Sequence, residues 1–185
     1  RGHTRIGFVG SITATSSIMD RYLGYYRSML THGLPIEASW TVPDRDCHGA
    51  YKPYPLPEPL PTAFVCNCDQ LALQLVQRLK ELGLAVPGDV SVVGFDDYVD
   101  AGGAEPPLTT FAVDQDALAR EAANLILQKM RGGNDRVGRV VVGGRLVTRA
   151  SVRDLREAQP AQTGLGEQTH IRKGKPASAV KPAQT

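Results

Sequence analysis

The chain has 185 residues, enough for one domain or for one full subdomain with part of another. Its hydrophobic fraction of 42% is ordinary for a globular protein, and its formal net charge of +2 is too small to indicate a nucleic-acid-binding face. No apolar run approaches the roughly 18 residues that span a bilayer, and the N-terminal residues lack the pattern of a signal sequence. We therefore expect a cytoplasmic protein without a membrane partner. Because residues 1–4 run straight into a predicted strand, we also expect the chain to be cut from a longer one.

Short β-rich segments recur through the first half of the chain. They are Arg5–Gly10, Ile36–Val42, Thr62–Cys68 and Val90–Phe95. Apart from the second segment, which alternates more, they are apolar almost throughout. Such runs are typical of parallel strands that are covered on both faces.

Two helical segments separate these strands. The first covers Ser17–His32 and stops at Gly33, and the second covers Asp69–Leu82, with Asp69 as N-cap and Gly83 as stop. Strands that alternate with helices predict an α/β fold in which a parallel sheet carries helices on both faces.

The connection Lys52–Pro61 has proline at every second position and interrupts this rhythm. Proline removes a backbone donor and disfavours helical geometry in the residue before it. We expect an extended, polyproline-like surface crossover there. A docking site for a proline-reading partner is the alternative.

The chain changes pattern after Pro107. We expect a strand or connector at Leu108–Val113, a helix at Gln115–Met130, and β structure at Arg139–Val152 that is broken by Gly143 and Gly144. The helix carries an apolar stripe that needs a partner, formed by Leu118, Ala122, Leu125 and Ile126. It therefore packs on the first sheet or belongs to a second subdomain. The polar, aperiodic residues 156–185 predict a disordered tail.

Polar side chains gather where the predicted strands end. A hydroxyl-rich loop, residues 10–17, follows the first strand and leads to Arg21; Asn67–Asp69 follow the third, and Asp96 and Asp97 close the fourth. Ligands of open parallel sheets bind beyond the carboxyl ends of the strands. Carboxylates that accept from hydroxyl groups, an arginine that donates and aromatic faces together suit a sugar.

Each of these residues also has a purely structural interpretation. Asp69 is well placed as a helix cap, and Arg21 can pair with a nearby carboxylate or face the solvent. Asp96 and Asp97 are residue types that form turns. The functional interpretation is favoured because all of them lie at the same end of one predicted sheet.

Several segments occur in the same order as in a known protein family. They are Gly2–Gly10, Arg21–Tyr25, Pro61–Val65, Asp69–Ala72, Gly83–Pro87, Asp89–Asp97 and Pro106–Thr110. In this series, over about residues 2–152, the chain resembles the LacI/GalR family of bacterial transcription regulators. Members carry a helix-turn-helix followed by a two-lobed core similar to periplasmic sugar-binding proteins. The resemblance implies that 1–108 form the C-terminal lobe, that 109–155 return into an otherwise missing N-terminal lobe, and that 156–185 are the tail.

The resemblance also implies a function: a repressor whose core senses a small-molecule effector, a sugar, with no cofactor, no metal and no catalytic activity. Operator DNA would be bound only through the missing N-terminal domain. Arg21 and Asp96 match positions that hold the effector, and Ser17 matches a further polar contact. The ligand-binding set that we predict is Ser17, Arg21, Cys68, Asp69 and Asp96.

The chain departs from the family pattern at several places. Cys68 stands where the family has Asn, Val113 stands where some members place a polar contact, and the proline-rich crossover replaces a helix. A thiol donates weakly where an amide would both donate and accept. The effector's identity is therefore left open.

The helix at Asp69–Leu82 has apolar residues around its circumference, including Leu71, Leu73 and Val76. In the proteins that the chain resembles, the equivalent surface pairs two subunits, so we expect a homodimer across these residues. The alternative is a helix covered entirely by its own chain.

Other kinds of protein fit the sequence less well than a sensor. Cys66, Cys68 and Cys47–His48 do not have the spacing of a zinc site, so we expect free thiols. A phosphoacceptor receiver domain would carry its acidic pair at the first strand of the sheet, not the fourth. An enzyme would need a nucleophile–base pair that the sequence does not offer. A sugar-binding protein of a transport system, which has the same fold, is the principal alternative.

Overall fold

A computed structural model of the chain describes residues 1–97, 101, 103–132 and 139–156. The tail predicted for 156–185 lies outside the described residues, apart from Arg156. The bounds of the strands are β1 (Ile6–Val9), β2 (Thr41–Val42), β3 (Ala63–Cys66), β4 (Ser91–Asp96), β5 (Thr109–Val113) and β6 (Gly144–Val147). The helices are α1 (Ser16–Thr31), α2 (Asp69–Glu81), α3 (Gln115–Met130) and a 3-10 turn, η1 (Ala38–Trp40).

These strands form one six-stranded sheet in the order β2-β1-β3-β4-β5-β6. Neighbouring strands from β2 to β5 are parallel, and β6 joins the edge antiparallel to β5. The predicted α/β fold with a mostly parallel sheet is confirmed. Because β1, β3 and β4 are parallel neighbours, their carboxyl ends meet at one rim of the sheet.

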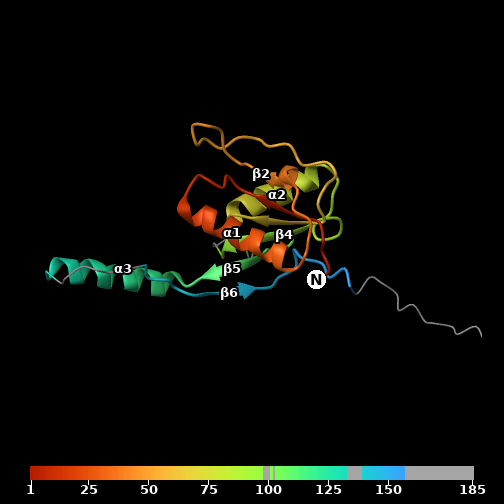
Figure 1. Cartoon of the computed structure of the whole chain (residues 1–185). Coiled ribbons are helices and arrows are strands. Elements are labelled where there is room, and N and C mark those ends of the chain that lie inside the picture. The colour runs from red at the N-terminus through yellow and green to blue at the C-terminus, as the bar shows by residue number, and fades with distance from the viewer. Residues whose placement is uncertain (98–100, 102, 133–138, 157–185) are drawn as a thin grey trace, which may run out of the picture.

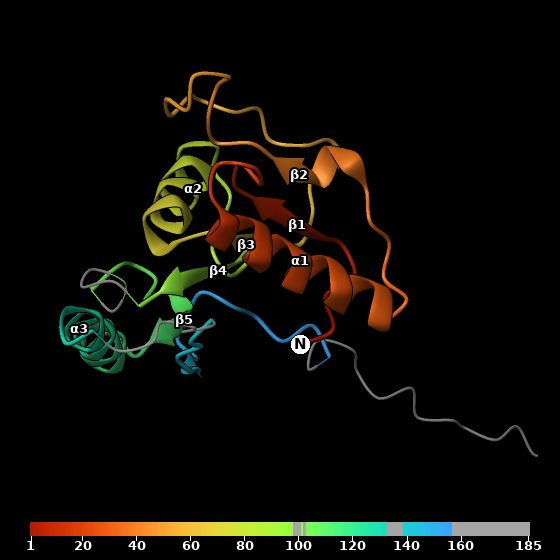
Figure 2. The same ribbon diagram turned by 60° about the vertical axis from the view of Figure 1, so that its left-hand side comes forward.

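Helices cover the two faces of the sheet (Figures 1 and 2). On one face α2 packs against Val9, Phe64 and Val92, all at or near zero exposure. On the other face α1 places Tyr25 and Met29 against Phe8. Successive strand residues thus serve opposite layers, which explains why the strands are apolar at almost every position.

Local capping fixes where the helices start. The Thr15 hydroxyl accepts a hydrogen bond from the Ile18 amide at 3.2 Å and so caps α1. The predicted N-cap of α2 was wrong by one residue: Cys68 is the cap, with extended backbone, and Asp69 is the first residue of the helix. Asp69 is buried, and its carboxylate accepts a hydrogen bond from the Thr110 hydroxyl in β5.

The predicted strand Ile36–Val42 is wrong over most of its length. Only Thr41 and Val42 pair with β1, and a 3-10 turn precedes them. This turn buries Trp40, whose carbonyl oxygen lies so close to Gly7 that a Cβ there would be 3.0 Å away. The alternating apolar residues therefore serve a packed turn at the sheet edge instead of an extended strand.

The proline-rich crossover contains no helix, in agreement with the prediction, and it packs against the core cluster that includes α2. Tyr54 is buried in the core cluster that contains α2, and Leu56 and Leu60 pack against the same cluster. The predicted dimer interface consists of Leu71, Leu73 and Val76. The chain itself buries Leu71 and Val76, and Leu73 is partly buried, so two of the three residues are already covered without a second subunit.

The helix α3 projects away from the body in Figure 1. In the part of the chain that the structure describes, none of its residues is buried, and Leu118 and Ile126 are 51% and 60% exposed. The sequence left two alternatives for the apolar stripe of α3: packing on the first sheet, or membership of a second subdomain. The first alternative is wrong, because the stripe does not pack on the sheet. The strands on either side of α3, β5 and β6, nevertheless belong to the same sheet as β1–β4.

Candidate functional site

The guanidinium of Arg21 joins the carboxyl ends of two strands. From the second turn of α1 it donates to the Asn67 carbonyl oxygen, after β3, at 2.5 Å. Its other terminal nitrogen lies 3.3 Å from a carboxylate oxygen of Asp96, the last residue of β4. Its central carbon also sits 3.9 Å from the centroid of the Phe95 ring. The arginine is thus fixed by a charge, a carbonyl and an aromatic face.

The carboxylate of Asp96 is partly withdrawn from water. Burial raises its pKa, the guanidinium of Arg21 acts in the opposite direction, and the charge of Asp69 adds to the rise. The raised pKa means that the ionised form of Asp96 is held at a cost, which a ligand that donates hydrogen bonds would reduce.

Backbone geometry at this rim is unusual. Asp96 and Asp97 have φ values of 107° and 56°, in a region that residues other than glycine rarely occupy. Such conformations cost about 1–3 kcal/mol each and persist where the surroundings enforce them. Here Asp97 forms an ion pair of 2.7 Å with Arg149, which also donates to the Leu108 carbonyl oxygen at 2.8 Å.

The other predicted residues have different environments. Asp69 is only 1% exposed and accepts a hydrogen bond of 2.6 Å from the Thr110 hydroxyl, so it ties α2 to β5. Cys68 is partly buried, and burial raises the pKa of its thiol. Ser17 is exposed, with its hydroxyl 3.0 Å from that of Thr15. Of the predicted set, the structure brings Arg21 and Asp96 into direct contact, with Cys68 at the same strand ends.

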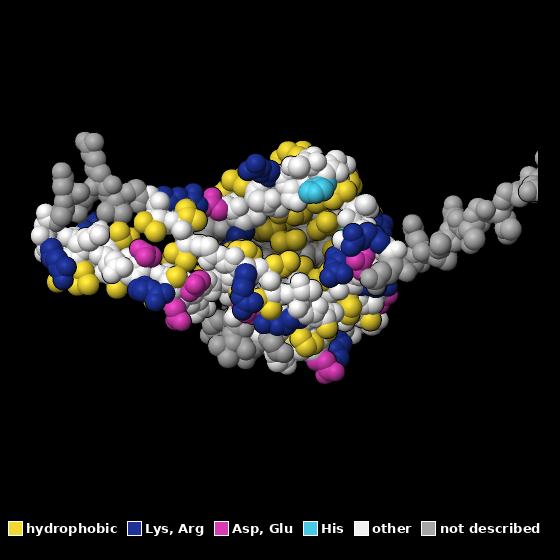
Figure 3. Space-filling model, turned by 90° about the horizontal axis from the view of Figure 1, so that it is seen from below, with side chains coloured by type: hydrophobic (Ala, Val, Ile, Leu, Met, Phe, Trp, Pro, Cys, Tyr) yellow, Lys and Arg dark blue, Asp and Glu magenta, His cyan; other side chains and the backbone are white. Residues whose placement is uncertain are grey.

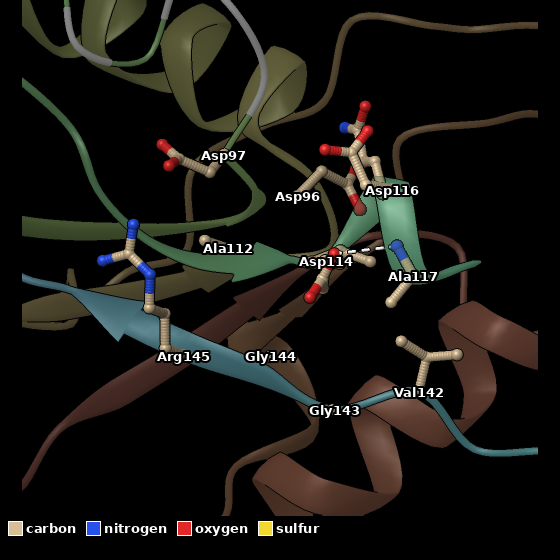
Figure 4. Close-up of a pocket in the computed structure, with 12 residues that line it drawn as sticks. Asp96, Asp97, Ala112, Asp114, Asp116, Ala117, Val142, Gly143, Gly144 and Arg145 are labelled. Atoms are coloured by element: carbon tan, nitrogen blue, oxygen red, sulfur yellow. Dashed lines mark hydrogen bonds between the residues drawn. The ribbon is translucent and has the colours of Figure 1, made fainter. Parts of the chain in front are cut away.

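A cleft of about 850 Å³ opens between the end of β4, the β5–α3 junction and β6 (Figure 4). Among the described residues, its charged lining consists of Asp96, Asp97, Asp114, Asp116 and Arg145. The Asp114 carboxylate accepts from the Ala117 amide at 2.9 Å and so caps α3. Among the predicted ligand-binding residues, Asp96 is the one that lines this cleft. Because ionised carboxylates only accept hydrogen bonds, this lining suits a ligand rich in hydroxyl or amine donors.

Arg21 borders a separate apolar groove of about 330 Å³ between α1 and the sheet. The groove is lined by residues that include Tyr25, Met29, Val65 and Phe95. Figure 3 shows a hollowed area of hydrophobic side chains on the underside of the body. The Arg21–Asp96 pair therefore stands between an acidic cleft and an apolar groove.

Sequence reasoning missed several residues that shape this rim. Asp44, which follows β2, is buried and accepts from the Ser11 amide at 2.7 Å, so it fixes the start of the hydroxyl-rich loop. The rings of Phe95 and Phe111 stack with centroids 5.1 Å apart. Asp44 could have been predicted from the sequence, because it is an acidic residue that follows a strand. The ion pair between Arg149 and Asp97 could not, because the two residues are 52 positions apart in the chain.

A model of the periplasmic binding protein-like domain matches residues 1–152. The chain belongs to this family. The resemblance to LacI/GalR regulators, predicted from the sequence, is confirmed by the similarities that follow.

Two curated relatives are named as repressors. The HTH-type transcriptional repressor PurR of Glaesserella parasuis is 30% identical over 166 residues, which cover 84% of this chain and 49% of the relative. The arabinose metabolism transcriptional repressor of Geobacillus stearothermophilus is 32% identical, with coverages of 83% and 44%. The chain thus spans about half the length of the curated relatives it matches. These relatives are named as transcription regulators, not as enzymes.

A solved structure agrees with this assignment. The transcriptional regulator CelR in complex with cellobiose superposes with a TM-score of 0.70 at 26% identity, covering 81% of this chain and 47% of that chain. Within the described residues, no cluster of three or more His, Cys, Asp or Glu side chains is arranged to hold a metal ion. Nor does any described helix combine the length and apolarity needed to cross a bilayer.

Proposed function

We propose that these residues form the effector-binding part of a ligand-responsive transcription repressor that senses a small molecule, a sugar. The observation that carries the proposal is the contact between Arg21 and Asp96 at the carboxyl ends of β3 and β4. One residue donates and the other accepts, and Phe95 offers a ring face beside them. This combination binds vicinal hydroxyl groups and the apolar face of a sugar ring.

The proposed effector is a neutral sugar. The adjacent cleft offers carboxylate acceptors to the hydroxyl groups of such a ligand, although Asp96 and Asp97 are already paired with arginines. The similarity to a regulator solved with cellobiose and to an arabinose metabolism repressor supports the same class. Ser17 and Cys68 would extend the site along the rim.

In the proposed mechanism, the effector binds one arrangement of the sensor better than another. Only this difference in affinity can shift the balance between the arrangements, and through it the spacing of two DNA-reading domains in a cytoplasmic homodimer. Operator binding is proposed for the protein that carries this segment together with a helix-turn-helix, not for these 185 residues.

A binding experiment tests the site. Cellobiose, L-arabinose and a panel of other neutral mono- and disaccharides are screened by thermal shift on the protein, and hits are measured by calorimetry. Arg21→Ala and Asp96→Ala should each weaken binding by at least about tenfold, because each removes a charge-assisted hydrogen bond.

Arg27→Ala is the matched control, since this arginine is exposed on the same helix. Its affinity for the sugar should equal that of the wild type. Unchanged affinity in both site variants would defeat the assignment. Sugar-dependent operator binding by the longer protein would distinguish a repressor from a sugar-binding protein of a transport system.

A further inference from the structure

We propose that Arg149 is a positioning residue for Asp96: it anchors Asp97 and thereby holds the end of β4 in the backbone conformation that presents Asp96 to Arg21. The functional part of this inference, that Arg149 tunes effector affinity, rests on the proposed function. The geometric part stands on contacts within the described residues.

Arg149 connects the end of β4 with the beginning of β5. Its guanidinium pairs with Asp97 at 2.7 Å and donates to the Leu108 carbonyl oxygen at 2.8 Å, and its backbone amide donates to the Thr109 hydroxyl at 2.9 Å. The side chains of Arg149 and Asp97 are each 22% exposed, so water competes weakly for this pair. An arginine whose donors are directed to a carboxylate and a carbonyl has little freedom to move.

The backbone at Asp96 and Asp97 needs such an anchor. Both residues have positive φ, which a Cβ-bearing residue rarely adopts without external support. These neighbouring carboxylates pair with arginines from different elements, Arg21 on α1 and Arg149 after β6. If Asp97 were released, the turn could relax and Asp96 would no longer be held 3.3 Å from Arg21.

The segment that carries Arg149, residues 148–156, is itself firmly attached to the sheet. The buried Ser151 hydroxyl donates to the Val92 carbonyl oxygen at 2.6 Å and accepts from the Thr109 amide at 2.8 Å. Directly before this segment, β6 pairs with β5, the strand that leads into α3. Beside the pairing of β6 with β5 and of β5 with β4, Arg149 is therefore a side-chain contact through which a displacement of β6 would reach the candidate site.

The test measures the pKa of Asp96 by carboxyl-carbon NMR titration of the 185-residue chain. In the wild type, Arg21→Gln should raise this pKa, because the guanidinium favours the ionised carboxylate. In an Arg149→Gln background the same substitution should change the pKa by less than half as much, since Asp96 no longer faces Arg21. An equal change in both backgrounds would overturn the proposal.

The exposed Arg153, in the same segment, supplies the control: an Arg153→Gln background should preserve the full effect of Arg21→Gln. If Arg149→Gln does not fold, Arg149→Met replaces it. Methionine keeps much of the apolar length of the side chain and removes the donors to Asp97 and to the Leu108 carbonyl oxygen. Retention of the full Arg21 effect in Arg149→Met would equally refute the proposal.

A second measurement addresses effector affinity. With whichever sugar of the panel binds the wild type, Arg149→Gln should weaken binding about fivefold, less than removal of Arg21 itself. If no sugar binds the wild type, the proposed function fails, while the titration still decides whether Arg149 positions Asp96. If sugar binds and Arg149→Gln leaves both affinity and titration unchanged, this inference fails alone.

Discussion

The helices α2 and α3 both carry an amphipathic pattern, but their environments are opposite. Both begin at a defined N-cap residue and carry apolar residues at helical spacing, over 13 and 16 residues. Yet α2 buries its apolar face between the sheet and the proline-rich crossover, while α3 buries no residue in the part of the chain that the structure describes. Helical periodicity indicates that a face requires a partner, but it does not identify the partner.

The body of the chain and α3 contribute differently to the free energy of folding. The buried apolar side chains gather in the body formed by β1–β5, α1 and α2, so the hydrophobic stabilisation comes mainly from this body. The α3 helix adds little to it here, because an isolated helix of this length is marginal in water without tertiary contacts. Substitutions in the body should therefore lower the free energy of unfolding more than substitutions in α3.

The largest contrast should come from matched leucines. Leu75→Ala in α2 removes a side chain with 0% exposure and should lower the free energy of unfolding by about 2–5 kcal/mol. Leu118→Ala in α3, at 51% exposure, should change it by no more than about 0.5 kcal/mol. Urea unfolding followed by circular dichroism measures both. Equal costs would mean that α3 is packed in solution.

A smaller contrast is expected from matched threonines. Thr110→Val removes the buried hydroxyl that donates to Asp69 at 2.6 Å, and should destabilise the protein by about 1–3 kcal/mol. Thr148→Val replaces an exposed hydroxyl just after β6 and should stay within about 0.5 kcal/mol of the wild type. If Thr110→Val proved neutral, the tie between α2 and β5 would contribute nothing to stability.

The smallest effect concerns pH and the amino ends of the strands. The His3 ring lies 3.0 Å from the Thr62 hydroxyl and 3.1 Å from the Arg153 carbonyl oxygen. Burial lowers its pKa below 6.5, so the unfolded chain binds the proton more readily than the folded one. This contribution to stability is fully present above pH 6.5 and is lost as the pH falls through the lowered folded pKa.

Substitution of this histidine isolates the effect. His3→Gln should make the free energy of unfolding less dependent on pH between pH 8 and pH 5, as measured by urea titrations at intervals across that range. An identical pH profile in wild type and variant would show that His3 does not link protonation to folding.

Much of the candidate site was accessible from the sequence, for a topological reason. Once β1, β3 and β4 are recognised as neighbouring parallel strands, the residues after them must share a rim, and so Arg21 and Asp96 were predicted to meet. The interior role of Asp69 was not accessible, because it depends on Thr110, in a strand 41 residues away. The same holds for the ion pair between Asp97 and Arg149.

The sequence by itself determined the order of strands and helices, the parallel sheet and the rim at which polar residues gather. These follow from periodicity and turn residues, which act over a few neighbours. Only the tertiary structure decided that Trp40 turns in a 3-10 helix, that the crossover covers α2 and that α3 lacks a partner among the described residues. Each depends on which surfaces meet across long stretches of chain, and local patterns carry no record of that.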